Sequence, residues 1–288
     1  MTTLRRGASA LACMLALLSC RPSEQNESVN NAADASATRE PAMPLVEPPH
    51  DRGDLLIAIA RAASAAAMGT DDAVVQRDLD GDRFEFRLRF GCPRPDSEEP
   101  GAGPFSVRFD RESRRLRLSA APTVSADDPV VTAIAGEEVE AVEGFWIERP
   151  WLLAAGCPAV PPPEQAETEA KPAEAADTEG DTNINPATPI LPRIAIAQFL
   201  TADDPRTDRR GKRPYEAAKT LPEGSEPSQQ GYDLVLSGRL RANGNGKVIS
   251  CTVISPDQPP TCMVSALFDR VWIRHPGTDE IIAEWGRN

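Results

Sequence analysis

The chain has 288 residues and a formal net charge of −13, with 44 acidic side chains against 31 lysines and arginines. Nucleic acids and anionic lipid headgroups attract clusters of basic side chains, so an overall acidic chain suits neither. Composition therefore argues against a general nucleic-acid-binding protein, and we expect no nucleic-acid partner.

The N-terminal segment combines basic, apolar and small residues in a fixed order. The pair Arg5-Arg6 precedes an apolar run over residues 8–18, which has signal-peptide length and is too short to span a bilayer. Leu17-Leu18-Ser19-Cys20 closes the run. This segment resembles the signal peptide and lipobox of bacterial lipoproteins. The resemblance implies that residues 1–19 are removed and that the sulfur of Cys20 is lipidated; an ordinary cleaved signal peptide or a transmembrane anchor is the alternative.

The resemblance also implies a location for the mature chain. Two or three acyl chains on Cys20 would make residence in the membrane effectively permanent. The next residue is Arg21 and not the Asp that retains such proteins at the inner membrane, which favours the outer membrane with the protein facing the periplasm. Residues 20–52 have no aromatic side chain and are rich in Ser, Asn, Ala, Glu and Pro, so we predict a disordered tether.

Residues 53–158 predict a helix followed by antiparallel strands. Asp54 is a plausible N-cap and Gly69 a plausible C′ residue for an Ala-rich helix between them. Residues 73–79 and 83–90 alternate apolar and polar side chains, and Asp80-Gly81 between them predicts a hairpin turn.

The same region continues with further predicted strands. In residues 83–90, the apolar side chains at even positions should face the core and the charged side chains at odd positions the solvent. We predict other extended segments at 105–109, 116–118, 130–134 and 139–147, and we expect Trp146 and Trp151 to close the core.

The rest of the chain divides into an acidic segment and a second β region. Residues 159–192 are rich in Pro, Ala and Glu and predict a disordered linker or insertion. Residues 193–288 predict antiparallel strands, with a hairpin turn at 243–246 and a meander ending near residue 285. The predicted fold class is α+β, mainly antiparallel β meanders with one N-terminal Ala-rich helix and long disordered segments. The pattern leaves open whether the two β regions share one sheet system.

Four cysteines remain beside Cys20 and the Cys13 of the signal segment. An even number in an exported chain predicts two disulfides, with three possible connectivities. Matching Gly-Cys-Pro triplets and a strand followed by a Pro-rich turn favour the pairs Cys92–Cys157 and Cys251–Cys262. Free buried thiols are the alternative. The spacing lacks any CxxC pair, which argues against a zinc site.

The sequence offers no recognisable catalytic motif. A GxSxG elbow, an HExxH pair and a Cys–His arrangement are all missing from the sequence. The acids at 78–82 lack the spacing of a calcium loop and fit a turn better. We therefore predict no catalytic residue, no metal site and no cofactor.

One basic cluster stands out in the acidic chain and forms the candidate anion-binding site, because guanidinium groups suit phosphate and carboxylate ligands. Its residues are Arg206, Arg209, Arg210, Lys212 and Arg213. A solvated loop neutralised by neighbouring acids is the alternative interpretation.

Together these features predict a lipid-anchored protein of the bacterial cell envelope that binds or assembles without catalysis. Its expected partners are the membrane, through the lipid on Cys20, and an envelope protein or an anionic envelope component. The alternative is a periplasmic domain that binds a small ligand or processes a substrate at an unrecognised site.

Overall fold

The computed structural model describes residues 47–70, 73–93, 103–136, 138–159, 192–206 and 209–286. They belong to one compact unit that starts at Glu47. The folded unit thus includes residues 47–52, which the sequence analysis assigned to the end of the tether. The predicted signal segment, Cys20, most of the tether and nearly all of the acidic segment lie outside the described residues.

Three helices and ten strands make up the described part of the chain. The helices are α1 (Arg52–Ala67), α2 (Ala73–Leu79) and α3 (Pro129–Ala135). The strands are β1 (Arg83–Phe90), β2 (Phe105–Asp110), β3 (Arg115–Ala120), β4 (Val139–Trp146), β5 (Ile194–Thr201), β6 (Tyr215–Thr220), β7 (Tyr232–Leu240), β8 (Ile249–Thr252), β9 (Thr261–Arg274) and β10 (Ile281–Gly286). The predicted α+β class with mostly β structure is confirmed.

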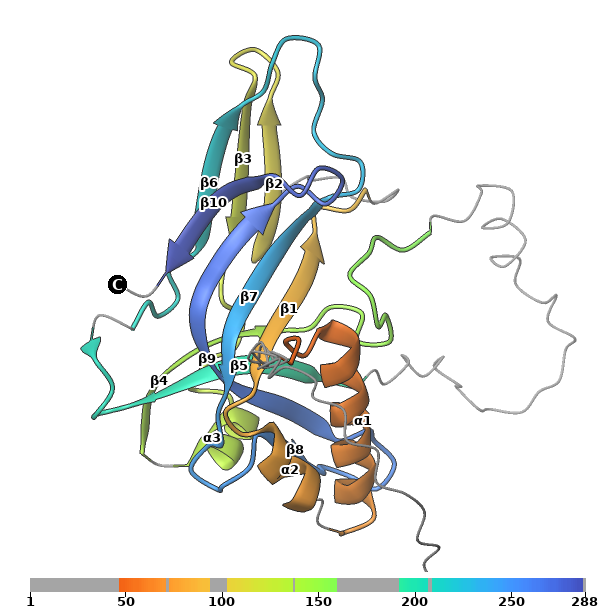
Figure 1. Cartoon of the computed structure of the whole chain (residues 1–288), viewed down its shortest axis with the longest axis vertical. Helices are drawn as coiled ribbons and strands as arrows, with labels where there is room; N and C mark the ends of the chain where they lie inside the picture. The colour runs from red at the N-terminus through yellow and green to blue at the C-terminus, as the bar shows by residue number, and fades with distance from the viewer. Residues whose placement is uncertain are drawn as a thin grey trace, which may run out of the picture. The chain divides into compact units, whose positions relative to one another are not determined.

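The long strand β9 organises the larger sheet (Figure 1). Its first residues pair with β8 on one edge and with β5 on the other, and its later residues pair with β7 and β10. Strand order along the main path is β1-β7-β9-β5-β4. β1 and β4 come from the first β region and the other strands from the second, so both regions share one sheet system. All pairs in this sheet are antiparallel except β5 with β9.

A bulge lies where β9 passes from one set of neighbours to the other. The register with β7 shifts between Ser237 and Gly238, so Asp269 is the extra residue. A Cβ atom on Gly238 would lie 1.9 Å from the carbonyl oxygen of Leu267, so only glycine fits at this close approach.

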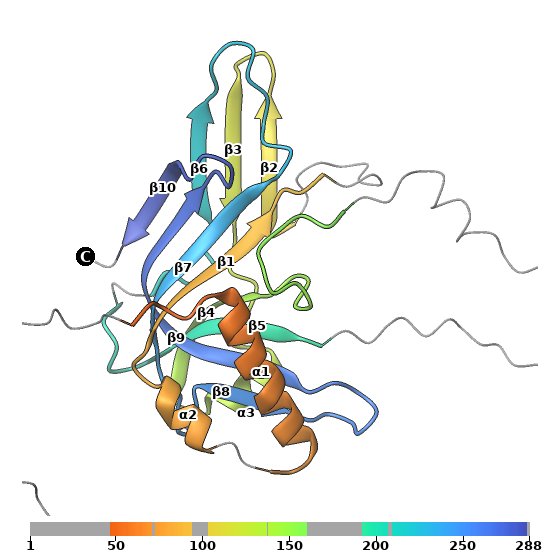
Figure 2. The same cartoon turned by 45° about the vertical axis from the view of Figure 1, so that its right-hand side comes forward.

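The second sheet has three strands in the order β2-β3-β6 (Figure 2). β2 and β3 form a hairpin, and β6 joins from the second β region. Its inner face contributes Leu116, Leu118 and Tyr215 to the main apolar core. That core also contains the phenylalanines of β1 and the buried residues of α1, so the alternation predicted for β1 is confirmed. A smaller core joins α3 to β4 and β5.

Helix α1 begins earlier than the sequence suggested. Asp51 is the N-cap: its side chain accepts from the backbone N–H of Asp54, and the Asp54 side chain accepts from the backbone N–H of Asp51. Asp54 is therefore the N3 residue of a capping box and not the N-cap. At the other end, Gly69 has a φ of +66°, and the N–H groups of Gly69 and Thr70 close a Schellman motif. The prediction of Gly69 as the C′ residue is confirmed.

Two segments predicted as strands are helices instead. Within residues 76–79 the buried side chains are Gln76 and Leu79, which are three residues apart and lie on one helical face. Asp80-Gly81 therefore links a helix to β1 and is not a hairpin turn. Residues 129–135 form α3, because Asp128 caps the helix and Pro129 occupies its first turn.

Two further predictions differ from the structure. The turn at 243–246 does not join a hairpin, because β7 and β8 both pair with β9 and not with each other. Trp151 is 56% exposed and does not close the core. Trp146 is half-buried, with the guanidinium of Arg193 centred 4.2 Å from its ring centroid.

Both predicted disulfides are confirmed. Cys92–Cys157 ties the end of β1 to the segment after β4, across 65 residues. Cys251–Cys262 joins directly opposed residues of β8 and β9. The two bonds constrain different parts of the molecule, one at the end of β1 and one between β8 and β9.

Candidate functional site

The outer face of the β2-β3-β6 sheet is hollowed and carries three exposed arginines. Arg108 in β2 lies directly opposite Arg117 in β3, and Arg115 lies two residues from Arg117 on the same face. The space above this face is about 1190 Å³, open to solvent. Small side chains make the hollow, namely Ser106, Ser119, Ala218 and the nearby Gly103. We call this surface the arginine groove.

The alternation of the sequence fixes the direction of these arginines. Leu116 and Leu118 are buried, so the residues on either side of them in β3 must point outwards. A register slip of one residue would turn the leucines to solvent and bury the arginines. The groove is therefore held by the same residues that build the core.

Two carboxylates share the face of the arginine groove. Asp110 pairs in register with Arg115, and Glu216 with Ser119. Asp110 accepts hydrogen bonds from the backbone N–H groups of Glu112 and Ser113 at 3.0 and 3.1 Å. The hydrogen bonds from Ser113, and then the charge of Arg117, lower the pKa of Asp110. The face remains net positive by one charge in a chain of net charge −13.

The basic loop predicted as an anion site is partly used by the protein itself. Arg209 donates to the carboxylate of Glu140 at 2.6 Å and to the carbonyl oxygen of Thr201 at 2.7 Å. Arg210 donates to the carbonyl oxygen of Pro214 and lies over the ring of Tyr215, 4.1 Å from its centroid. The exposed cations of the loop are Arg206, Lys212 and Arg213. Arg213 is exposed but donates to the carbonyl oxygen of Arg210 at 3.1 Å, so three of the five cations make hydrogen bonds to the protein. Anion binding by this loop stays a prediction.

A buried acid lies beside this loop. Glu143 of β4 is 3% exposed and accepts a hydrogen bond from the hydroxyl of Tyr215. Burial raises the pKa of Glu143, and the Tyr215 hydroxyl and the charges of Arg210 and Arg213 oppose that shift. Burial, and then the charge of Glu143, raises the pKa of Tyr215. The two groups satisfy each other, and their role on this geometry is to join β4 to β6.

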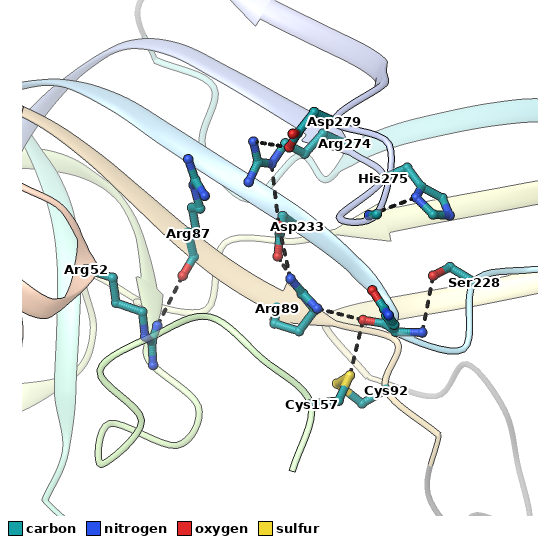
Figure 3. Close-up of polar contacts among 12 residues, drawn as sticks. Arg52, Arg87, Arg89, Cys92, Cys157, Ser228, Asp233, Arg274, His275 and Asp279 are labelled. Carbon is teal, nitrogen blue, oxygen red and sulfur yellow. Dashed lines mark hydrogen bonds and ion pairs between the residues drawn. A yellow bond between two sulfur atoms is a disulfide. The ribbon is translucent and has the colours of Figure 1, made fainter. Parts of the chain in front are cut away.

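An ion-pair network crosses three strands on the opposite face of β1 (Figure 3). Asp233 is 1% exposed and lies between two arginines, with Arg89 Nε at 2.6 Å from Oδ1 and Arg274 Nε at 3.4 Å from Oδ2. Arg274 also pairs with exposed Asp279 at 2.8 Å. The register places Arg89, Asp233 and Arg274 side by side in β1, β7 and β9.

The first disulfide adjoins this network. Arg89 donates to the carbonyl oxygen of Gln230 at 2.9 Å, and Cys157 Sγ lies 3.2 Å from the same oxygen. The network and the disulfide thus hold the start of β7 against the end of β1. We interpret the cluster as structural, because its charges are matched within the protein.

Arg52 is buried among backbone carbonyl groups. Its guanidinium donates to the carbonyl oxygens of Leu152, Arg87, Glu148 and Arg149 at 2.9–3.4 Å. Burial, and then the charge of Arg149, lower the pKa of Arg52 to about 10, so it remains a cation at neutral pH. The adjoining hollow of about 300 Å³ is lined by Arg52, Arg89 and Arg149, all of which already donate to protein acceptors. Arg52 therefore joins α1 and β1 to the segment after β4.

Another hollow lies between the C-terminal half of α1 and β8. It has about 700 Å³ of space open to solvent. Its lining includes Ala62, Ala65 and Ala66 of α1, Ile249 and Cys251 of β8, and Asn245 and Lys247. The hydroxyl of Ser250 accepts from the side-chain amides of Asn243 and Asn245 at 3.0 and 3.1 Å. This mixed apolar and polar lining could hold a small molecule.

Within the described part of the chain, no group of three or more His, Cys, Asp or Glu side chains is placed to hold a metal ion. Among the same residues, no helix is both long and apolar enough to cross a bilayer.

Sequence reasoning missed the arginine groove. Its signal was partly present, because Arg108 and Arg117 occupy outward positions of two predicted extended segments and Arg115 directly precedes the second. The missing information was the register that places Arg108 against Arg117.

Comparison with known proteins returned no match: no protein-family model, no curated protein and no solved structure is similar to this chain. The site must therefore be interpreted from its own chemistry.

Proposed function

We propose that this protein is a lipid-anchored binding protein of the bacterial cell envelope, held in the outer membrane through Cys20 and acting in the periplasm without catalysis. The observation that carries the proposal is the motif Leu17-Leu18-Ser19-Cys20 directly after a basic pair and a short apolar run. The two disulfides support export, because disulfides persist in oxidising compartments.

A binding role is supported by the kind of surface that the described residues present. The arginine groove is wide, open and charged, which suits recognition of an anionic envelope component or an acidic protein surface. Glu143, whose pKa is raised by burial, is enclosed and already bonded to Tyr215, so it is poorly placed to meet a substrate.

A small-ligand-binding role is the second candidate, and the hollow between α1 and β8 favours it. Ala66→Phe would fill this hollow from α1, whereas Ala67→Phe changes the neighbouring helical residue, which does not line it. A metabolite retained through purification by the wild type and by Ala67→Phe, but not by Ala66→Phe, would support this candidate.

Metabolic labelling with radioactive palmitate in a bacterial host tests the anchor. We expect label on the wild type and on Cys13→Ala, and no label on Cys20→Ala. Label that persists on Cys20→Ala would refute the anchor.

Density-gradient separation of the inner and outer membranes tests the proposed outer-membrane location. We expect the wild type in the outer-membrane fraction and Arg21→Asp in the inner-membrane fraction. Wild-type protein in the inner-membrane fraction would refute the outer-membrane part of the proposal.

A further inference from the structure

We propose that the arginine groove binds a phosphate ester that also carries hydroxyl groups, such as a phosphorylated sugar. This inference names a ligand for the binding role proposed above, and it does not depend on lipidation of Cys20. It begins from the position of the three arginines, which project from adjacent strands of one rigid sheet.

Arg108 and Arg117 place like charges directly opposite each other in β2 and β3. Directly opposed residues of an antiparallel pair have Cβ atoms about 4.5–5.5 Å apart, and like charges at this spacing destabilise the pair. Arg115 adds a third charge about 7 Å along the strand. Among the described residues, neither Arg115 nor Arg117 makes an ion pair with a carboxylate. An anion held by Arg115 and Arg117 would offset the repulsion between their two charges.

The number of donors favours phosphate over carboxylate. Three guanidinium groups and the hydroxyls of Ser106 and Ser119 line one hollow. A phosphate monoester brings close to two negative charges and three strong acceptor oxygens, whereas a carboxylate brings one charge and two oxygens. Arginine forks bind the tetrahedral oxygens of phosphate in pairs.

Glu216 indicates what else the ligand carries. Its carboxylate lies in register with Ser119 at the β6 side of the groove and would repel a second anion placed there. The same carboxylate accepts hydrogen bonds from hydroxyl groups. A ligand with its phosphate over β2 and β3 and its hydroxyl groups over β6 satisfies both ends of the groove.

Calorimetric titration of the full-length protein in detergent micelles tests the inference, with glucose phosphate as the first probe. We expect the double variant Arg115→Gln/Arg117→Gln to bind at least roughly tenfold more weakly, since it loses the charge-assisted hydrogen bonds of two guanidinium groups. The matched control is Arg61→Gln/Arg111→Gln, which removes the same charge from exposed positions that do not line the groove.

Three results would overturn the proposal: no measurable binding of glucose phosphate by the wild type, an equal loss in the control variant, or equally tight binding of the dicarboxylate glutarate. The source of the phosphate is resolved by a second probe, the water-soluble headgroup glycerophosphoinositol phosphate. Tighter binding of this headgroup indicates a lipid, and tighter binding of glucose phosphate indicates a free sugar phosphate. A preference for either probe supports the site. Unchanged thermal unfolding of the two double variants shows that they are folded.

Discussion

Asp233→Asn should be among the most damaging conservative substitutions in this protein. The side chain is 1% exposed, and its two oxygens face Arg89 and Arg274, whose side chains are only 12% and 13% exposed. The amide keeps the shape of the carboxylate but removes the charge that both arginines need. Leaving a buried charge without its partner costs about 3–5 kcal/mol, and we expect about 3 kcal/mol because the arginines retain some solvent. For a body of this size, that loss lowers Tm by about 6–12 °C.

Urea and thermal unfolding, followed by tryptophan fluorescence, measure this loss. Asp279→Asn is the matched control, since Asp279 pairs with the same Arg274 at 2.8 Å but is 75% exposed. An exposed pair contributes at most about 1 kcal/mol, so the control should lower Tm by less than about 4 °C. If the two variants lose equal stability, the network gains nothing from its burial and the reasoning is wrong.

Three other predictions follow from single contacts. Gly238→Ala should cost about 2 kcal/mol or more in urea unfolding because its Cβ meets a carbonyl oxygen, whereas Gly156→Ala, with open space around it, should change stability by less than about 0.5 kcal/mol. Replacing Cys92 and Cys157 by serine should cost about 4 kcal/mol from the loop that the bond closes, and an unchanged midpoint would contradict this. Burial raises the pKa of Glu143, so the native state holds the Glu143 proton to higher pH than the unfolded chain does. The free energy of unfolding should therefore fall as the pH rises from the ordinary glutamate pKa to the raised one. Glu143→Gln should abolish that fall, and the same pH dependence in the wild type and the variant would contradict the prediction.

Local pattern was sufficient for some elements and not for others. β1 could be predicted because phenylalanine and leucine alternate with charged residues over its whole length. Residues 73–79 are a short mixed run that fits a strand or a helix, and long-range contacts settled the choice. Gln76 accepts a hydrogen bond from the backbone of Ile249 at 2.7 Å, from a residue far along the chain. The start of α3 could have been predicted, because Asp128-Pro129 is a typical helix start. The apolar residues that follow led to the prediction of a strand instead.

The arrangement of the second β region depends on contacts that no local pattern contains. β9 is long enough to pair with four strands, and its apolar run is interrupted by charged residues only at Asp269-Arg270. The bulge at Asp269 and the close approach at Gly238 divide that run between two sets of neighbours. The turn at 243–246 has the composition of a hairpin turn, but its flanking strands lie along the same edge of β9. Composition identified a turn there and could not identify its partners.

The position of charged residues along the sequence was an equally incomplete guide to the candidate sites. Basic residues that are dense along the chain mark the loop at 206–213, where Arg209 and Arg210 turned out to bind the protein's own carboxylate, carbonyls and aromatic ring. The arginine groove has cations that are dispersed along the chain and become dense only through the register of β2 and β3.

That register depends on the hairpin turn between the two strands. Arg114 has a φ of +52° and donates to the carbonyl oxygens of Leu221 and Ser225, which fixes the turn to the loop after β6. A ligand responds to how close the charges lie in space. The turn helps to set that spacing, although it lies outside the hollow. The turn and the buried leucines of β3 thus specify the same register, and this register places Arg108 opposite Arg117.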